Sequence, residues 1–179
     1  MNRKNKASSA PVPKILKQNK FSPLALEIIK KLKKSGFQAY LVGGCVRDSL
    51  VGIKAKDFDV STDATPEEVK KIFRSSRIIG KRFRLVHVFS SNELIEVSTF
   101  RADTSKTNHS SGIIKDSEGK ILRDNVWGTL EEDCIRRDFS INALYFDPVE
   151  NHLCDFHDGL KHIQKKILVS IGNLSLIHI

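Results

Sequence analysis

The stretch Leu41-Val42-Gly43-Gly44-Cys45-Val46-Arg47-Asp48 is followed closely by Asp57-Phe58-Asp59-Val60. An apolar run that ends in two glycines is typical of a strand entering a tight turn. The paired glycines permit positive φ and let a phosphate approach backbone N–H groups. Arg47 lies one turn further on, where its guanidinium could bind a triphosphate. The pattern is not GxxxxGK[ST], which disfavours a P-loop kinase or ATPase.

Asp57 and Asp59 are the second part of this pattern. On a strand, residues two apart leave the same face, while Phe58 between them points the other way, into the core. Two carboxylates so close repel unless a cation neutralises them. Mg²⁺ does this well, because it prefers one or two carboxylates together with phosphate oxygens and water. A solvated strand end is the alternative for such a pair alone, but the nearby glycine turn favours a metal site.

A third group of polar residues is Arg136-Arg137-Asp138 with Asn142. Two arginines beside an acid at a helix end could hold phosphates, while Asp138 and Asn142 hydrogen-bond a sugar or base. Arginines are also ordinary at a helix C-terminus, so this group alone decides nothing. Glu96 is expected in the middle of a strand, either as a third carboxylate near the metal or as the partner of a structural arginine.

The bulk properties favour a polyanionic partner, either nucleic acid or an anionic membrane surface, although the charge alone fits a merely basic soluble protein equally well. The 179 residues can bury one core, and 30 Lys+Arg against 21 Asp+Glu give a net charge of +9, which favours a polyanionic partner. No apolar run approaches the about 20 residues of a membrane span, and the N-terminus lacks the apolar core of a secretory signal. Three widely spaced cysteines show neither CxxC nor zinc-ligand spacing. We therefore expect a cytoplasmic protein, with no obligate protein partner evident.

Residues 1–20 offer little to bury and are expected to form a flexible basic arm. Residues 21–173 are expected to form one domain, in which 101–120 is a long polar loop. Strands and helices alternate without a strict βαβ order, which predicts an α/β protein of the α+β type with a mixed β-sheet. Expected helices begin after Ser22, at Cys45, after Thr65 and after Thr129, and expected strands lie at 38–42, 58–60, 85–89, 94–100, 144–147, 152–156 and 167–171.

Together, the motifs resemble the class II nucleotidyltransferases of the DNA polymerase β superfamily, a group that contains bacterial poly(A) polymerase and the CCA-adding tRNA nucleotidyltransferases. Residues 40–48 are similar to the family's LVGGxVRD element and 56–60 to its KDxD metal strand. Residues 136–144 are similar to its RRDFTINAL element, with Ser140 in place of Thr. The resemblance implies a nucleotidyltransferase head domain with helices on one side of a mixed sheet. It also implies an in-line attack by an RNA 3′-hydroxyl on the α-phosphate of a nucleotide.

Carried over residue by residue, the resemblance implies a set of catalytic acids and a set of nucleotide-binding residues. The acids would be Asp57 and Asp59, as ligands of Mg²⁺, together with Asp138, and the nucleotide-binding residues would be Gly43, Gly44, Arg47, Arg137 and Asn142.

Within the family, residues 78–87 resemble a segment of the bacterial poly(A) polymerases, and 122–125 points the same way. We therefore expect a template-independent polynucleotide adenylyltransferase that adds AMP from ATP to RNA 3′ ends, with CCA addition to tRNA as the second reading. Residues 174–179 depart from the family, which continues there into a helical neck and body. A truncated, inactive RNA-binding fragment is therefore a third hypothesis, supported by the net charge.

Overall fold

The computed structural model describes residues 8–10, 13, 16, 21–81, 83–103, 113–115, 121–124 and 126–172. The helices are α1 (Pro23–Lys34), α2 (Gly44–Val51), α3 (Pro66–Ile72), α4 (Leu130–Ile135) and α5 (Gly159–Lys165), with a 3₁₀ turn, η2, at Ser140–Asn142. The strands are β1 (Ser8–Ala10), β2 (Ala39–Val42), β3 (Asp59–Thr62), β4 (Ser76–Ile79), β5 (Leu85–Ser90), β6 (Glu93–Thr99), β7 (Ile113–Lys115), β8 (Ile121–Asp124), β9 (Leu144–Asp147) and β10 (His152–Asp155).

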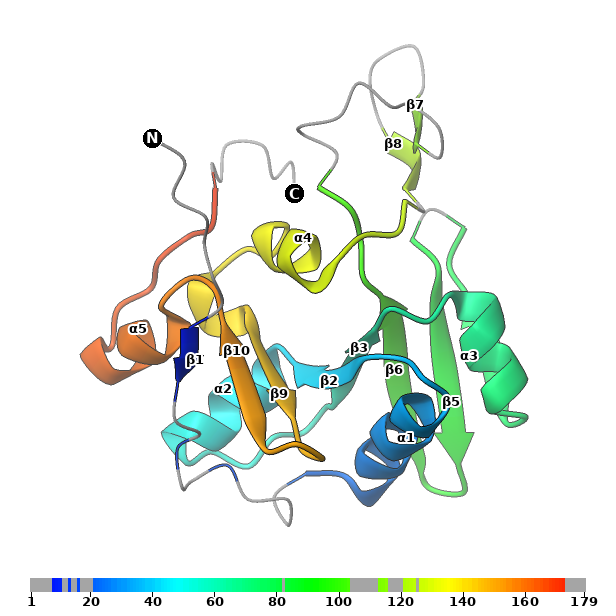
Figure 1. Cartoon of the computed structure of the whole chain (residues 1–179), viewed down its shortest axis with the longest axis horizontal. Coiled ribbons are helices and arrows are strands. Elements are labelled where there is room, and N and C mark those ends of the chain that lie inside the picture. Colours follow the sequence, from blue (N-terminus) through cyan, green and yellow to red (C-terminus); the bar gives the residue numbers. More distant parts are fainter. Residues whose placement is uncertain are drawn as a thin grey trace.

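A mixed sheet forms the centre of the molecule (Figure 1). Its strand order is β1-β10-β9-β2-β3-β6-β5-β4, where β1 is a short edge strand that extends seven others. The β3–β6 pair is parallel, whereas β2 pairs antiparallel with both β3 and β9. This confirms the mixed α/β fold expected from the sequence.

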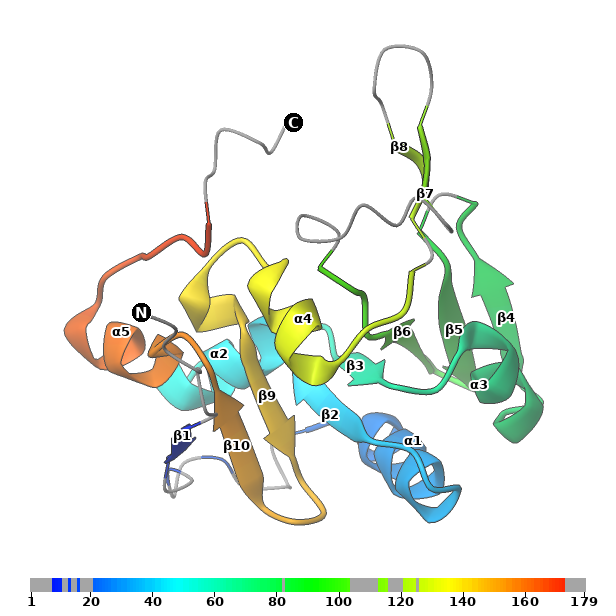
Figure 2. The ribbon, with the colours of Figure 1, turned by 45° about the horizontal axis from the view of Figure 1, so that its top comes forward.

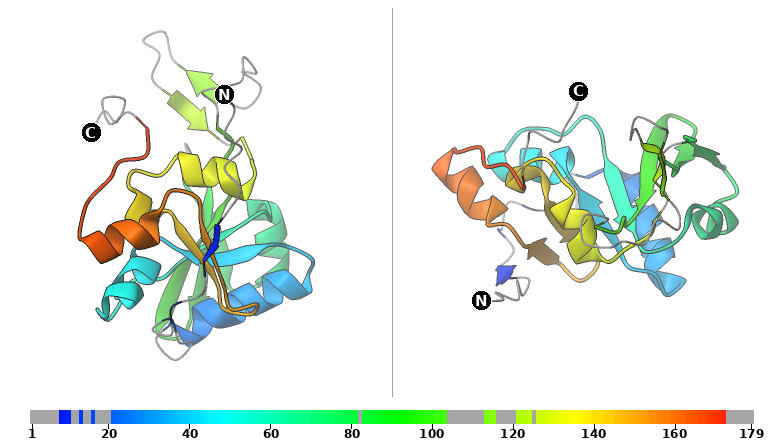
Figure 3. Two further views of the ribbon diagram at one scale, coloured as in Figure 1. Left: turned by 60° about the vertical axis from the view of Figure 1, so that its left-hand side comes forward. Right: turned by 90° about the horizontal axis from the view of Figure 1, so that it is seen from above.

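The two faces of the sheet carry different cores. One face packs against α1 and α3. There, Val60 and Val97 of the sheet lie in one core cluster with Ile28 of α1. On the other face, Val42 and Tyr145 pack against α4, which lies across the strands from α1 (Figure 3). The resemblance implied helices on one side of the sheet. The structure differs in that α4 packs on the face opposite to α1. Because successive strand residues alternate between faces, Asp59 and Ser61 lie on the α4 face when Val60 lies on the α1 face.

Helix caps set the boundaries that the sequence predicts. Ser22 Oγ accepts a hydrogen bond from Ala25 N at 3.1 Å at the start of α1. Thr65 and Thr129 each form a reciprocal capping box with the glutamate three residues on, at the starts of α3 and α4. Each such cap stabilises its helix by about 1 kcal/mol. These three helices begin where the sequence places them.

The segment expected as a long loop at 101–120 contains part of a hairpin. Strand β7 pairs antiparallel with β8, and the pair stands away from the main sheet (Figure 2). The prediction of a structureless loop is therefore wrong for 113–115, because short strands are stabilised by pairing with a partner that local sequence does not reveal. The rest of that segment, apart from 101–103, lies outside the described residues.

Two further expectations differ at the chain's ends. In the stretch expected to be a flexible arm, β1 pairs with β10, and Leu16 is 5% exposed within the core. An edge strand such as β10 offers unpaired N–H and C=O groups, so even a polar segment can add to it. Residues 167–171 form no strand. They contain one isolated bridge, between Phe139 and Ser170, after the unexpected helix α5. Residues 174–179 lie outside the described part of the chain.

Candidate nucleotide and metal site

Asp59 is the first residue of β3 and lies at the centre of the candidate site. Its register partner is Val42 on one side and Glu96 on the other, across the parallel β3–β6 pair. Burial raises the pKa of the Asp59 carboxyl, and the nearby Glu96 and Asp57 carboxylates raise it further, while Arg137 lowers it. Asp57 precedes the strand rather than lying within it. The pair of acids is nevertheless close enough to interact.

Phe58, between the two aspartates, packs against the core on the α1 face. Its ring meets that of Phe21 edge-on at a centroid distance of 6.5 Å. This agrees with the expected alternation along the chain, in which the aromatic ring anchors the segment on one face and Asp59 lies on the other.

The glycine turn lies directly beside Asp59. Gly43 caps α2 with φ 74° and ψ −135°, a conformation that is open to glycine and strained for other residues. A Cβ added there would lie 3.5 Å from Arg137 Nη1 and 3.9 Å from Asp59 Oδ2. The fold thus brings the turn, an acid and an arginine together, although they come from three separate sequence motifs.

Arg47, on α2, is held by two polar groups. Its Nε and Nη2 contact Asp48 Oδ1 at 2.9 and 2.8 Å, and its Nη1 donates to Asn142 Oδ1 at 2.8 Å. Asn142 Nδ2 in turn donates to Asp138 Oδ1 at 3.2 Å. The first and third motifs are therefore joined by a chain of hydrogen bonds, in which Asp138 contacts Asn142 on the Arg47 side of the site.

A further acid, Asp133, was not singled out by sequence reasoning. Its Oδ2 accepts from Tyr145 OH at 2.6 Å and from Ser61 Oγ at 3.3 Å, and its Oδ1 accepts from Arg101 N at 3.1 Å. Arg137 donates from Nε to Tyr145 OH at 2.8 Å and lies 3.8 Å from Asp133 Oδ2. In the sequence, Asp133 looks like an ordinary acid in the first turns of a helix, so only the register of β9 against the sheet reveals this network.

These contacts set the charge state of Arg137. Burial alone would lower the pKa of its guanidinium, but Tyr145 and Asp133 outweigh burial and the pKa is raised. Burial also raises the pKa of the Tyr145 hydroxyl well above its usual range, with Asp133 adding to the effect. Arg137 is therefore a permanent cation next to Asp59, with a neutral phenol holding it in place.

The carboxylates at Asp59 suit Mg²⁺. Glu96, the nearest of them in the strand register, also contacts His87 Nε2 at 3.2 Å through Oε1. The charges of Glu96 and Asp57 raise the Asp59 pKa, and a bound cation would offset this repulsion. Within the described residues, no group of three or more His, Cys, Asp or Glu side chains forms a complete metal cage. A pair such as Asp57 and Asp59 fits Mg²⁺, because that ion takes few protein ligands and completes its shell with phosphate and water.

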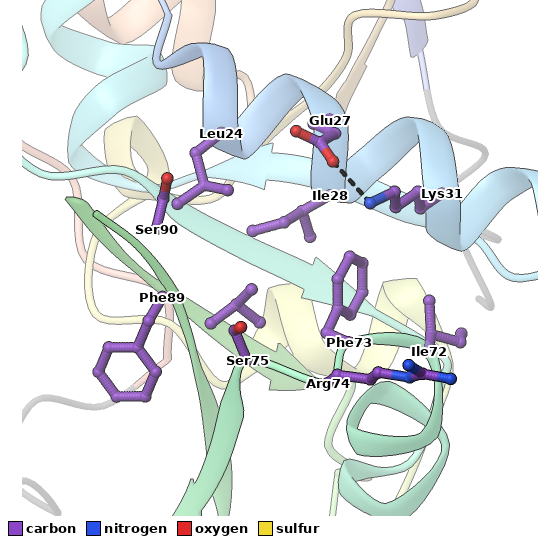
Figure 4. Close-up of a pocket in the computed structure, with 11 residues that line it drawn as sticks. Leu24, Glu27, Ile28, Lys31, Ile72, Phe73, Arg74, Ser75, Phe89 and Ser90 are labelled. Atoms are coloured by element: carbon purple, nitrogen blue, oxygen red, sulfur yellow. Dashed lines mark ion pairs between the residues drawn. The ribbon is translucent and has the colours of Figure 1, made fainter. Parts of the chain in front are cut away.

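Two hollows lie on opposite faces of the sheet. A hollow of about 410 Å³ lies between α1, the end of α3 and β5, where Glu27 and Lys31 form an exposed ion pair at 2.6 Å (Figure 4). It contains none of the expected site residues. A second hollow, of about 250 Å³, is lined by Arg137 and Asp133 on the α4 face. Of these two hollows, the one on the α4 face therefore contains an expected site residue, Arg137.

Residues 39–169 match the model of the poly A polymerase head domain. The chain belongs to this family. It is 48% identical over 154 residues to poly(A) polymerase I of Haemophilus influenzae, and 36% identical over 149 residues to a CCA-adding enzyme of Bacillus licheniformis. These alignments cover 86% and 83% of this chain, but only 34% and 35% of the two relatives. The chain thus spans about a third of the length of these relatives.

Solved structures support the same head-domain fold. The chain is similar to the Bacillus stearothermophilus CCA-adding enzyme in complex with CTP, with a TM-score of 0.66 and 34% identity. That match covers 85% of this chain and 34% of the other. In the described part of this poly A polymerase head domain, no helix has the length and apolar character needed to cross a membrane.

Proposed function

We propose that this head domain belongs to a template-independent polynucleotide adenylyltransferase that transfers AMP from ATP to RNA 3′ ends. The observation that carries the proposal is the placement of Asp59 beside Asp57, Glu96 and the Gly43 turn. The higher identity to a poly(A) polymerase I, 48% against 36% for a CCA-adding enzyme, favours ATP and RNA as the substrates. Three free, buried cysteines agree with a reaction in the reducing cytoplasm.

In this proposal, the Gly43 turn and the N-terminus of α2 bind the triphosphate, because backbone N–H groups and the helix dipole favour anions there. Arg47 pairs with the outer phosphates, and its contacts with Asp48 and Asn142 orient it. Asp138 and Asn142, which contact each other, bind the sugar or base of the nucleotide.

Asp57 and Asp59 would hold Mg²⁺, which, when bound, would lower the pKa of the attacking hydroxyl and neutralise charge on the leaving pyrophosphate. The other residues position the reactants. Arg137, a cation next to Asp59, offsets negative charge as the α-phosphate is attacked. The fixed contacts of Arg137 with Tyr145 and Asp133 mean that little rearrangement is needed during the reaction.

The test is incorporation of labelled AMP into a single-stranded RNA in the presence of Mg²⁺ and ATP. Asp57→Asn and Asp59→Asn should each reduce the rate by at least about 10³-fold, because each removes a ligand that acts on developing charge. Glu27→Gln is the matched control, since its exposed ion pair with Lys31 lies on the opposite face of the sheet. Incorporation that is unchanged in both aspartate variants would rule out the metal assignment.

CCA addition is the second candidate, favoured by the likeness to a solved CCA-adding enzyme in complex with CTP. The same assay distinguishes the two, with ATP and CTP offered separately to a tRNA lacking its terminal nucleotides and to an unrelated RNA. Extension of the unrelated RNA with ATP alone supports polyadenylation, whereas CTP incorporation restricted to the tRNA supports CCA addition. Salt-sensitive RNA binding without incorporation of either nucleotide would support an inactive RNA-binding fragment.

A further inference from the structure

The sheet face that carries Asp59 is packed against a helix on one half only. Helix α4 lies over β2 and β9, where Val42 and Tyr145 are buried in its core cluster. Among the described residues, that cluster contains none from β4, β5 or β6, which lie to one side of α4 (Figure 2). The helices that contact β5 and β6, namely α1 and α3, do so from the opposite face.

The alternation of side chains along β5 and β6 identifies the residues on this half of the α4 face. Alternate residues of both strands, such as Val86 and Val97, are buried in the core on the α1 face. The residues between them therefore lie on the α4 face. Together with Arg77 of β4, they form what we call the open face: Arg77, Leu85, His87, Phe89, Leu94 and Glu96.

Two large apolar side chains of the open face are exposed next to each other. Phe89 and Leu94 are register partners across β5 and β6, and they are 39% and 43% exposed. The Phe89 ring meets the His87 ring edge-on at a centroid distance of 6.1 Å, and His87 Nε2 contacts Glu96 Oε1 at 3.2 Å. Phe89 also borders the hollow beneath α1, but its ring is directed away from the middle of that hollow (Figure 4). An exposed aromatic ring on a sheet face is a surface on which single-stranded bases stack.

Strand register places the open face beside the candidate metal site. One row of paired residues crosses β3, β6, β5 and β4, and it consists of Asp59, Glu96, His87 and Arg77. Because neighbouring strands lie about 4.8 Å apart, the backbone of His87 is about 10 Å from that of Asp59, and that of Arg77 is about 14 Å away. The glycine turn follows β2, which pairs with β3 on its other side. Asp59 therefore lies between the glycine turn and the open face.

This order across the sheet indicates which substrate the open face suits. In an in-line displacement, the attacking and leaving oxygens lie on opposite sides of the α-phosphorus. Under the proposed function, the triphosphate binds at the glycine turn, on the β2 side of Asp59, so the RNA 3′-hydroxyl approaches from the β6 side. We propose, resting on the proposed function, that the open face binds single-stranded RNA next to the reacting 3′ end, with a base stacked on Phe89 and a backbone phosphate at Arg77. Stacking tolerates any base, as a reaction without a template requires.

The first test measures binding of a short, 5′-labelled single-stranded RNA by fluorescence anisotropy. Phe89→Leu keeps an apolar side chain but removes the ring, and it should weaken binding by about 5- to 100-fold, the range expected for one stacked base. Phe89→Trp keeps an aromatic ring and should bind at least as tightly as wild type, to within about twofold. Val149→Ala is the control, because Val149 is a similarly exposed apolar residue, 43% exposed, in the turn between β9 and β10.

The same binding measured between about 50 and 200 mM salt tests the phosphate contact. Each phosphate contact to a single strand contributes about 0.7 to the slope of log K against log salt. Arg77→Gln should lower the slope by about 0.7, whereas Arg77→Lys keeps the charge and should retain it. Phe89→Leu should leave the slope unchanged, because it removes no charge. Arg74→Gln is the control, since Arg74 is an exposed arginine that borders the hollow beneath α1.

The second test measures the KM for the RNA primer and the KM for ATP. In Phe89→Leu, the primer KM should rise by about fivefold or more while the ATP KM stays within about twofold. Three results would overturn the assignment: wild-type RNA affinity in Phe89→Leu, an equal loss of affinity in Phe89→Trp, or an equal loss of salt slope in Arg74→Gln. A dimer in sedimentation equilibrium that Phe89→Leu dissociates, with unchanged RNA affinity, would assign the open face to a second copy of the chain instead.

The two proposals fail in distinguishable ways. If the wild-type chain incorporates no AMP, the proposed activity fails. A loss of RNA affinity in Phe89→Leu, but not in Phe89→Trp or Val149→Ala, would then support the RNA-binding face on its own. If the wild type extends RNA and all variants bind RNA as it does, the open face is not the RNA site and the activity stands.

Discussion

Tyr145→Phe should destabilise the protein by removing one hydroxyl group from the α4 face. Tyr145 is fully buried, at 0% exposure, so the ring stays packed when the oxygen is removed. The hydroxyl donates to Asp133 Oδ2 at 2.6 Å and accepts from Arg137 Nε at 2.8 Å. Its loss leaves a half-buried carboxylate and a half-buried guanidinium each short of one partner.

The size of the effect follows from these contacts. Hydrogen bonds to charged groups contribute about 1.5–3 kcal/mol each, and a buried charged group left without a partner is costly. Asp133 keeps Ser61 Oγ and the backbone N–H of Arg101, and Arg137 keeps its ion pair with Asp133. We therefore expect a loss of about 2–3 kcal/mol in the free energy of unfolding rather than twice the single-bond value.

Urea unfolding followed by circular dichroism measures this loss, and thermal unfolding should show a fall in Tm of roughly 4–12 °C for a chain of this size. Tyr40→Phe is the matched control, because its hydroxyl makes an exposed hydrogen bond to Gln38 Oε1 at 3.2 Å. That change should stay within about 0.5 kcal/mol of wild type. If Tyr145→Phe is as stable as Tyr40→Phe, the hydroxyl does not hold the two charged groups, and the account of Arg137 is wrong.

Two further predictions concern Asp59 and the packing around α5. Burial, Glu96 and Asp57 raise the pKa of Asp59 above 3.8 in the folded state. Ionisation of this carboxylate therefore destabilises the folded protein above the folded-state pKa. Below pH 3.8 the group is protonated in both states, and the destabilisation disappears. Asp59→Asn should therefore raise the Tm in chelator at pH 7, by an amount that shrinks as the pH falls towards 4, and a gain independent of pH would contradict this. A Cβ on Gly159 would lie 2.3 Å from the carbonyl oxygen of Ser140. Gly159→Ala should then lower the free energy of unfolding by about 1–3 kcal/mol in urea titrations, and wild-type stability would show that this contact is not tight.

Several parts of the fold were predictable because their signals are local. Ser22, Thr65 and Thr129 cap helices by bonding to N–H groups within three residues, so the starts of α1, α3 and α4 could be read from the chain. The apolar run into Gly43 likewise predicts β2, the turn and α2. The network at Asp133 has no such signal, because Tyr145 is 12 residues away and reaches it only through sheet pairing.

The amino-acid sequence by itself determined the chemical groups of the candidate site: a glycine that can adopt φ 74°, two aspartates two residues apart, and the arginines. The tertiary structure decided which of these groups meet. Asp59 lies beside Glu96 because β3 pairs in parallel with β6, and beside Arg137 because α4 packs on that face of the sheet. Strand register and helix placement depend on burying apolar surface across the whole domain, so no short stretch of sequence encodes them.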